Sequence, residues 1–516
     1  MVTEILSGAV YGVGGKIVTV ELDFSNGLPC MEIVGNPGGE VREAPKRVRV
    51  ALKNNGIVLP AQRITFNLSP ADLYKEGTGY DLPIAVALLE AMGLIDPEST
   101  KQVLFVGELG LDGEIKQVPG ILPIVIEAGK RNIKKVILPK ANAAEGAAPG
   151  TVEVIGVESL SELIGYLQLP SEMADSMIAP TVYHWEEEGM NVGTEDFADI
   201  CGQESMKRGM EIAAAGFHNI LMIGPPGAGK TMAAKRLAGI LPPIGREESM
   251  EVSAVYSVAG LLNEEQSMIR KRPFVAPHHT ATLQALAGGG RCPKPGLISR
   301  AHKGVLFLDE VVHFSSQTLE ILRQPMEDKK IEISRSRGSY EYPADFMLVA
   351  AMNPCPCGNY PDLNLCRCTP EQVRRYLEKL SGPVLDRIDL TVEMSKIRVQ
   401  DLHVQWDKNS SIRGSEAMRE AVLRAREMQK KRFENTGISF NAQMSARQME
   451  EYVPLKENER RYLENAYEKM NLSLRGYHKV IRVARTIADI EGEETVQIRH
   501  LEEALCYRSV EGRYWG

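Results

Sequence analysis

The chain has 516 residues, of which 43% are hydrophobic and 25% charged, so it has the composition of an ordinary globular protein with about three or four domains. It contains no run of about 18 apolar residues and does not begin like a signal peptide, so we expect a cytoplasmic protein without a membrane span. The net charge of −8 excludes a uniformly basic nucleic-acid-binding coat, although a local basic ring or hairpin is compatible with it.

Residues 1–168 combine short strand-like runs with one strongly apolar helix. Alternating or clustered apolar side chains predict strands at 16–22, 31–35 and 135–139. The apolar run at 83–93 predicts a buried helix closed by a C-terminal glycine. The sequence therefore predicts an α+β module, and we find no metal-ligand or nucleophile pattern in it.

Two segments of this module resemble the proteolytic domain of Lon. Lys75–Asp81 is similar to its serine-bearing loop, and Gly107–Gly120 is similar to the strand pair before its catalytic lysine. The resemblance implies a fold like domain 2 of ribosomal protein S5. The serine and lysine positions fall on or beside Gly79 and Leu122, whereas a Ser–Lys dyad needs a hydroxyl and an amine. We therefore expect an inactive domain with a structural role or a docking role toward a protein partner.

Residues 169–195 lose periodicity and become acidic, which is typical of a linker. The next motif begins with the apolar run Ile220–Ile223, which predicts a buried strand. Gly224–Thr231 then fits the pattern G-x-x-x-x-G-K-T, in which backbone amides and a helix N-terminus bind phosphate. This segment predicts a site for ATP, with contacts from Gly224, Pro225, Pro226, Gly227, Ala228, Gly229, Lys230, Thr231 and Met232.

Two further buried strands carry polar residues at their ends. The strand at 303–308 leads to Asp309, which with Thr231 would hold Mg²⁺, and to Glu310, which would polarise the attacking water. The strand at 346–352 leads to Asn353, which can sense the terminal phosphate. Asn before Pro is also an ordinary turn signal, so the role of Asn353 is open at this point.

Four cysteines follow within fourteen residues, in the pattern C-x-C-x8-C-x-C. Such a cluster suggests a structural Zn²⁺ site with four thiolate ligands, with free reduced thiols as the alternative. The expected zinc ligands are Cys355, Cys357, Cys366 and Cys368.

Two segments between these motifs have turn signals. Residues 274–291 suggest a loop that interrupts a helix, with a triple glycine at its tip. Residues 329–342 alternate on either side of Gly338 and predict a hairpin with basic residues near its turn. Either this hairpin is an ordinary solvated surface hairpin, or it tracks the phosphates of DNA. The candidate DNA contacts are Lys329, Lys330, Arg335 and Arg337, with Arg291 as a second choice.

From about residue 414 the chain has helical spacing. Helices are predicted at 416–433, 457–470, 475–490 and 499–508, and we expect them to form a helical lid over 396–516. Just before this region, Arg387 stands between two aspartates, so a local salt bridge is one reading of it.

These motifs, in this order, identify an AAA+ ATPase core over 196–395 with the cysteine insert at 355–368, within an α/β multidomain chain. Several short sequence motifs narrow the resemblance to the magnesium-chelatase-like ATPases of the ComM (YifB) family. They are Ala276–Thr280, Gly288–Arg291, Phe307–Glu310, Leu322–Pro325, Ala351–Gly358, Ser381–Asp389 and Arg482–Asp489.

That resemblance implies a homo-hexamer with ATP bound between subunits. Arg387 would then be the finger that reaches the neighbour's terminal phosphate, and Arg475 the second sensor of the lid. The family implies a DNA helicase that drives branch migration in natural transformation. The alternative is a chelatase-type motor that remodels a protein partner for metal insertion. One departure is Val311–Phe314, where the family more often has Leu-Pro-Glu-Phe.

Overall fold

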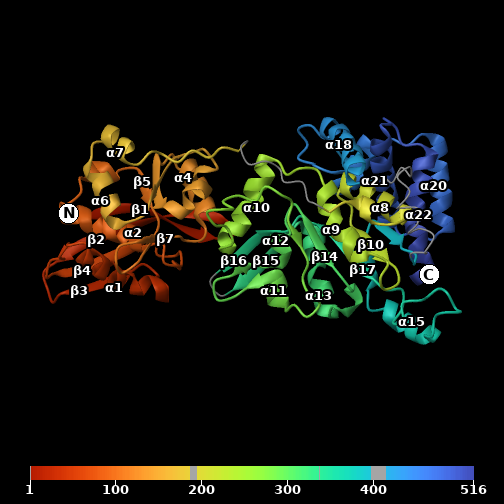
Figure 1. The fold of residues 1–516 in the computed structure, drawn as a ribbon, viewed down its shortest axis with the longest axis horizontal. Helices are drawn as coiled ribbons and strands as arrows, with labels where there is room; N and C mark the ends of the chain where they lie inside the picture. Colours follow the sequence, from red (N-terminus) through yellow and green to blue (C-terminus); the bar gives the residue numbers. More distant parts are fainter. Residues whose placement is uncertain (1, 186–194, 336–337, 397–413, 516) are drawn as a thin grey trace.

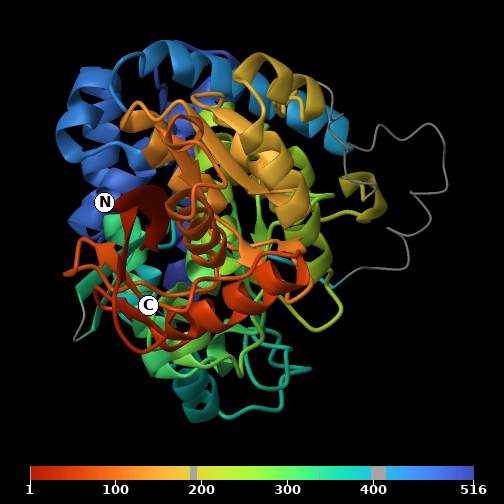
Figure 2. The same cartoon turned by 90° about the vertical axis from the view of Figure 1, so that its left-hand side faces the viewer.

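The computed structural model describes residues 2–185, 195–335, 338–396 and 414–515. The molecule is elongated, with the N-terminal module at one end, a parallel-sheet core in the middle and a helical lid at the other end (Figure 1). The view from the N-terminal end shows that module in front of the core (Figure 2). None of the helices in the described ranges combines the length and apolar character that a bilayer crossing requires.

The N-terminal module is built on a mixed seven-stranded sheet in the order β3-β4-β2-β1-β5-β8-β9. Its strands are β1 (Thr3–Tyr11), β2 (Gly14–Ser25), β3 (Cys30–Val34), β4 (Arg63–Ser69), β5 (Val103–Phe105), β8 (Lys135–Pro139) and β9 (Glu153–Val157), with a separate ribbon of β6 (Glu108–Leu109) and β7 (Ile115–Lys116). Its helices are α1 (Gly39–Asn54), α2 (Asp81–Ala91), α3 (Pro97–Thr100), α4 (Ile121–Lys130), α5 (Ala143–Ala147), α6 (Leu160–Gln168) and α7 (Ser171–Met177).

Helix α2 is the centre of this module, because all of its residues from Asp81 to Leu89 are buried. Burying the Asp81 carboxylate would be costly without a partner. Arg47 on α1 supplies one: its Nε and NH2 donate to the two carboxylate oxygens at 2.7 and 2.8 Å. Burial raises the pKa of Asp81, and the Arg47 guanidinium opposes that rise. The pair therefore joins the two long helices of the module.

The core contains a five-stranded sheet in the order β11-β14-β17-β10-β18, and every neighbouring pair in it is parallel. Its strands are β10 (Ile220–Ile223), β11 (Phe274–Val275), β14 (Val305–Leu308), β17 (Met347–Met352) and β18 (Leu390–Glu393). Flanking helices include α8 (Glu204–Gly216), α9 (Lys230–Ile240), α10 (Arg246–Ala259), α11 (Leu283–Ala287), α12 (Leu297–Arg300), α13 (Ser316–Ile321), α14 (Arg323–Asp328), α15 (Pro370–Leu377) and α16 (Gly382–Leu385). Parallel strands bring all their carboxyl ends to one edge of the sheet, where ligands bind in such folds.

The lid is helical, as predicted. It consists of α18 (Ser415–Arg432), α19 (Ala446–Tyr452), α20 (Glu457–Lys469), α21 (Leu474–Glu491) and α22 (Ile498–Trp515). Helix α22 returns to the core, where Tyr514 donates to Glu393 of β18 at 2.9 Å and Trp515 donates to the carbonyl of Leu377 at 3.1 Å. The C-terminal end of the lid is thereby anchored to the sheet.

Two predictions for connecting segments need correction. The expected linker at 169–195 contains helix α7, and Ala174 and Ile178 belong to the apolar core of the N-terminal module. Residues 186–194 of that segment lie outside the described residues. The triple glycine does not interrupt a helix. It follows α11 and forms β12 (Gly288–Gly289), which pairs with β13 (Lys294–Pro295) as a short ribbon. All three glycines have positive φ, which only glycine adopts readily.

The N-terminal module and the core are joined by polar and apolar contacts. The Ser257 hydroxyl of α10 donates to buried Glu145 at 2.6 Å, and the carbonyl of Ser257 accepts from the Gly120 amide at 3.0 Å. Leu122 and Ala148 pack with Ala254 and Met268 of the core in one small apolar cluster. The interface thus has a buried centre.

A second contact joins the N-terminal module to a hairpin of the core, β15 (Lys330–Arg335) and β16 (Gly338–Pro343). The Tyr11 hydroxyl, at the end of β1, donates to the Ser339 carbonyl at 2.9 Å. The rings of Tyr11 and Tyr340 lie 4.8 Å apart between centroids. The N-terminal module therefore rests directly on β16.

Candidate functional site

The predicted phosphate loop lies between β10 and α9, at the carboxyl edge of the core sheet. Gly227 and Gly229 have φ values of +76° and +91°, a conformation that side-chain-bearing residues rarely adopt. These two glycines let the loop turn sharply into the N-terminus of α9. Backbone amides at a helix N-terminus are a favourable environment for phosphate.

Lys230 is held in the middle of this loop. Its Nζ donates to the carbonyls of Gly224 and Pro225 at 2.7 and 2.9 Å, and to Asn353 Oδ1 at 3.0 Å. Burial lowers the pKa of Lys230, and the carboxylates of Asp309 and Glu310 oppose that change. The amine and the Asn353 side chain, 123 positions apart in sequence, therefore meet at one point.

The two predicted acidic residues lie beside the loop. Thr231 Oγ1 donates to Asp309 Oδ2 at 2.7 Å, so the two expected Mg²⁺ ligands are in contact. Hydroxyl and carboxylate oxygens are the donors that Mg²⁺ prefers. Glu310 has a φ of +49°, its side chain is exposed, and its amide donates to Asp309 Oδ1 at 2.9 Å. A non-glycine residue in this conformation is strained, as residues at functional sites often are.

The unusual residues after this acidic pair do not disturb it. Val311 and Val312 are buried in the apolar cluster behind the site. His313 is exposed and its ring centroid lies 6.5 Å from that of Tyr376 and 6.1 Å from that of His279. The departure from the family pattern is thus accommodated by packing away from Asp309 and Glu310.

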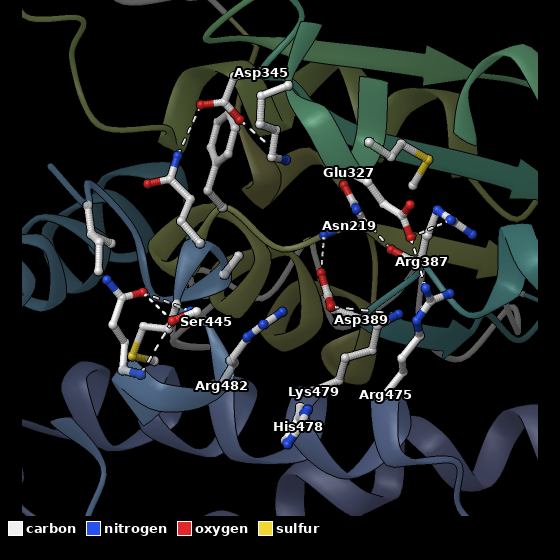
Figure 3. A pocket seen from close by; sticks show the side chains of 18 of the residues that line it. Asn219, Glu327, Asp345, Arg387, Asp389, Ser445, Arg475, His478, Lys479 and Arg482 are labelled. Atoms are coloured by element: carbon white, nitrogen blue, oxygen red, sulfur yellow. Dashed lines mark hydrogen bonds and ion pairs between the residues drawn. The ribbon is translucent and has the colours of Figure 1, made fainter. Parts of the chain in front are cut away.

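Arg387 and Arg475 lie at the opposite edge of the sheet. Arg387 precedes β18, and β18 runs parallel to β10 with Leu390 beside Ile220. The phosphate loop leaves the other end of β10, about 13 Å away along a four-residue strand. Arg475 lies close to Arg387, because both guanidiniums contact Glu327 of α14 (Figure 3). The structure therefore brings the two arginines together but separates them from the phosphate loop of their own chain.

Arg387 does not form the local salt bridge considered from the sequence, because the carboxylate that it contacts is Glu327. Burial lowers the pKa of Arg387, and Glu327 acts in the opposite direction. Asp389 instead accepts from the Asn219 amide at 2.9 Å and faces Lys479 at 3.8 Å. Burial alone would raise the pKa of Asp389, but Lys479 and other cations hold it below the usual value.

The two arginines line a cavity of about 720 Å³ between the core and the lid (Figure 3). One face of α21 supplies Arg475, Lys479 and Arg482 to it, at the spacing of successive helical turns. Its carboxylates include Glu327 and Asp389. Glu327 was missed in the sequence analysis, because an acid at the end of a six-residue helix gives no periodic or motif signal.

The four cysteines after Asn353 form a compact group. Their Sγ atoms lie within 4.8 Å of one another, with Cys355 Sγ 3.4 Å from Cys357 Sγ and 3.8 Å from Cys366 Sγ. Four sulfurs about 2.3 Å from a tetrahedral Zn²⁺ would be roughly 3.8 Å apart. The four thiols differ in pKa: backbone amides of Asn359 and Arg367 lower the pKa of Cys357 to about 6, whereas burial and the neighbouring thiols raise the pKa of Cys366 and Cys368. The donor set therefore fits zinc.

The cysteine insert also touches the phosphate loop. Gly358 has a φ of +80°, and a Cβ at this position would lie 2.4 Å from Cδ of Pro226. The insert and the loop are therefore packed against each other without space for a side chain at this point.

The predicted hairpin is confirmed as β15–β16, but its basic residues differ in availability. Lys329 is paired with Asp345 at 3.3 Å and Lys330 with Glu341 at 2.6 Å. Arg335 is exposed and lies beside the glycine ribbon, with NH2 3.4 Å from the Cβ position of Gly289. Arg291 at the end of that ribbon is also exposed. Arg337 lies outside the described residues. Arg335, at the end of β15, thus lies beside the ribbon whose connection carries Arg291.

The two positions at which the sequence led us to look for a Lon-like dyad have no catalytic geometry. Leu122 is fully buried, and a side chain at Gly79 would meet Val106 at 3.2 Å. The nearest amine in the loop, that of Lys75, is buried and donates to the carbonyls of Gly35 and Leu68 at 2.9 and 2.8 Å. Burial lowers the pKa of Lys75, but the amine is enclosed by these backbone carbonyls.

Comparison with known proteins shows which family the chain belongs to. Models for "Magnesium chelatase, subunit ChlI", "Subunit ChlI of Mg-chelatase" and "Magnesium chelatase, subunit ChlI C-terminal" match residues 196–402, 20–142 and 413–508. The competence protein ComM of Haemophilus influenzae is 42% identical, over 98% of this chain and 97% of the relative. The chain belongs to the ComM family of magnesium-chelatase-like proteins.

Other ComM-family relatives include the YifB protein of Salmonella typhimurium, which is 42% identical over 98% of this chain and 96% of its own length. The 67 kDa magnesium-chelatase subunit of Heliobacterium mobile is 28% identical, but over only 32% of this chain and 29% of its own length. Membership of the ComM family implies an AAA+ core with ATPase activity, and it suggests ATP and Mg²⁺ as ligands.

Proposed function

We propose that the chain is a cytoplasmic ATP-driven AAA+ motor that assembles as a homo-hexamer and acts on DNA. The observation that carries this proposal is the separation of the site into two halves. Lys230, Asp309 and Asn353 meet at the carboxyl edge of the core sheet, whereas Arg387 and Arg475 are joined at the amino edge. A complete site then needs the carboxyl edge of one copy and the amino edge of a second copy.

In the half-site at the carboxyl edge, the loop from Gly224 to Met232 would bind the phosphates through its amides and Lys230. Thr231 and Asp309 would hold Mg²⁺, which neutralises developing charge on the phosphates. Glu310, exposed beside Asp309, would accept a proton from the attacking water. Asn353, already in contact with the Lys230 amine, would orient the terminal phosphate.

The half-site at the amino edge supplies positive charge to a neighbour. Arg387 would act as the arginine finger, and Arg475 would act beside it because both share Glu327. Since the two guanidiniums lie together, we infer that both reach the same neighbouring nucleotide. An arginine supplied in this way accelerates phosphoryl transfer by roughly 10³- to 10⁵-fold in other nucleotide hydrolases.

DNA is the proposed substrate, and the proposed activity is branch migration during natural transformation. The name of the Haemophilus relative, a competence protein, supports this choice, as does its match over nearly the whole chain. Arg335 at the end of β15 and Arg291 in the nearby glycine ribbon would track phosphates without reading sequence. The N-terminal module, proposed to be an inactive Lon-like domain, offers a docking surface for a protein partner.

The chelatase-type alternative rests on the relatedness of the core. A magnesium-chelatase subunit matches about a third of the chain, so a motor that remodels a protein partner would have the same ATP site. ATP hydrolysis measured with forked DNA, four-way DNA and no DNA separates the two activities. A rate that no DNA structure changes would favour the chelatase-type motor.

We also propose one structural Zn²⁺ in the cysteine insert, because the four sulfurs have the spacing of a tetrahedral site. With all four positions taken by protein, its role would be to fold the insert and not to take part in chemistry.

The shared site is tested by mixing two inactive variants of the full chain. Glu310→Gln should retain ATP and hardly hydrolyse it, and Arg387→Ala should lose on the order of 10³-fold in rate. In a mixture, some interfaces combine an intact Glu310 with an intact Arg387 from different subunits. Activity above that of either variant alone is the expected result. A mixture that never exceeds them would contradict the two-edge arrangement.

A further inference from the structure

Glu327 contacts both arginines but has no role of its own in the proposed reaction. One of its oxygens, Oε1, accepts from Arg475 NH2 at 3.1 Å and also from Arg387 NH2 (Figure 3). Arg387 NH1 is held by the Pro383 carbonyl at 2.6 Å, and only 6% of the Arg387 side chain is exposed. The carboxylate therefore joins an almost buried arginine of the core to an arginine of the lid. We call these three side chains the arginine bracket.

In the arginine bracket, the Glu327 carboxylate occupies the place beside the two guanidiniums that the terminal phosphate would take in the proposed reaction. A terminal phosphate carries more charge than a carboxylate and has three acceptor oxygens, so it can receive both guanidiniums at once. The side chain of Glu327 is 47% exposed and that of Arg475 56% exposed. Water can therefore solvate the carboxylate as it leaves, which keeps the exchange inexpensive.

Glu327 also lies at the base of the β15–β16 hairpin. It is the penultimate residue of α14, and β15 begins at Lys330. The two hairpin strands are closed at this end by Lys329, whose carbonyl accepts from the Ala344 amide at 2.7 Å and whose Nζ contacts Asp345 at 3.3 Å. A shift of Glu327 thus acts three residues before the first strand of the hairpin.

We propose that Glu327 is a positioning residue that holds Arg387 and Arg475 together in the resting subunit, and that the terminal phosphate of the neighbouring subunit's nucleotide displaces it. On displacement, the end of α14 and the base of the hairpin lose their tie to the lid. The state of one subunit's nucleotide is thereby transmitted to the hairpin of the next. This inference rests on the proposed sharing of the ATP site and adds the link between hydrolysis and the DNA-contacting element.

The test compares Glu327→Gln with Glu320→Gln in the full-length protein. Glu320 is a matched control, since it is a half-exposed carboxylate on the preceding helix that pairs at 2.7 Å with Arg323, outside the bracket. ATP hydrolysis is measured across ATP concentrations, with and without forked DNA. Glu327→Gln should raise kcat without DNA roughly three- to tenfold, because a neutral amide holds the two arginines less tightly than the carboxylate does.

Two further readouts distinguish this role from simple stabilisation. The KM for ATP should not rise, because the phosphate loop lies at the other edge of the sheet and the terminal phosphate no longer competes with a carboxylate for the arginines. Stimulation by DNA should fall towards one. Glu327→Asp, which keeps the charge, should restore part of the stimulation. Glu320→Gln should resemble the wild type in every measurement.

Glu327→Gln with wild-type kcat and wild-type stimulation would overturn the inference. So would a Glu327→Gln protein that is as inactive as Arg387→Ala, because Glu327 would then be needed to place the arginines for reaction. Absence of ATP hydrolysis in the wild type and in Glu320→Gln would instead remove the proposed function, and this inference with it.

Discussion

Replacement of Gly358 by alanine tests whether the cysteine insert supports the phosphate loop. At its φ of +80°, alanine is strained by roughly 1–2 kcal/mol. The new Cβ would also lie 2.4 Å from Cδ of Pro226, far inside a normal carbon–carbon contact of about 3.5–4.0 Å. Relieving such an overlap costs about 1–3 kcal/mol, and the ring of Pro226 cannot rotate away.

If most of that overlap is relieved by moving the phosphate loop, ATP affinity should fall about tenfold or more, since 1.4 kcal/mol corresponds to a factor of ten. The assay is equilibrium binding of ATP to the full-length variant, together with its zinc content. Gly492→Ala is the matched control, because Gly492 has a φ of +76° but nothing within 4 Å of its Cβ position. It has the same strain without the overlap, and its ATP affinity should not change. Equal ATP affinities for the two variants would refute this reasoning.

Three further predictions concern other parts of the chain. Arg47→Ala leaves the Asp81 carboxylate, which is 0% exposed, without its ion partner, so the free energy of unfolding measured in urea should fall by roughly 3–5 kcal/mol. The control is Arg63→Ala, because the pair of Arg63 with Glu32 is half exposed; a destabilisation by Arg47→Ala no greater than that of this control would contradict the prediction. Elemental analysis should find one zinc per chain, and Cys355→Ser with Cys366→Ser should abolish it; near-zero zinc in reduced wild-type protein removes the site. Arg335→Ala with Arg337→Ala should weaken DNA binding most at low salt and reduce the salt slope by about 0.9 for each phosphate that the protein no longer neutralises, with ATP binding intact; an unchanged slope would move the DNA path to Arg291.

The elements with strong local patterns were predictable from the sequence. The phosphate loop, the acidic strand end and the four long lid helices lie where glycine spacing and 3.6-residue periodicity place them. Helix α1 was not predicted: it has an internal proline, Pro45, and many charged residues, although its buried Val41, Val48 and Leu52 recur at helical spacing. The glycine ribbon was also misjudged, because its pairing depends on residues that come after the glycines.

Within the candidate site, sequence reasoning identified side chains but not their grouping. Lys230, Asp309 and Asn353 could be expected to meet, because each follows a strand of one parallel sheet. That Arg387 would face Glu327 and Arg475, and not its neighbouring aspartates, depends on how the lid packs against the sheet. No local pattern carries that information.

The interface between the N-terminal module and the core has a practical consequence for deletion experiments. Leu122 and Ala148 share an apolar cluster with Ala254 and Met268, and Tyr11 covers the hairpin at Tyr340. A truncated chain that starts at the core would expose Ala254 and Met268 to water, and its hairpin would lose the contact with Tyr11. A change in ATPase rate after such a truncation would therefore mix the removal of a docking domain with the destabilisation of the motor. Single substitutions at Tyr11, such as Tyr11→Phe to remove the hydrogen bond alone, separate these two effects.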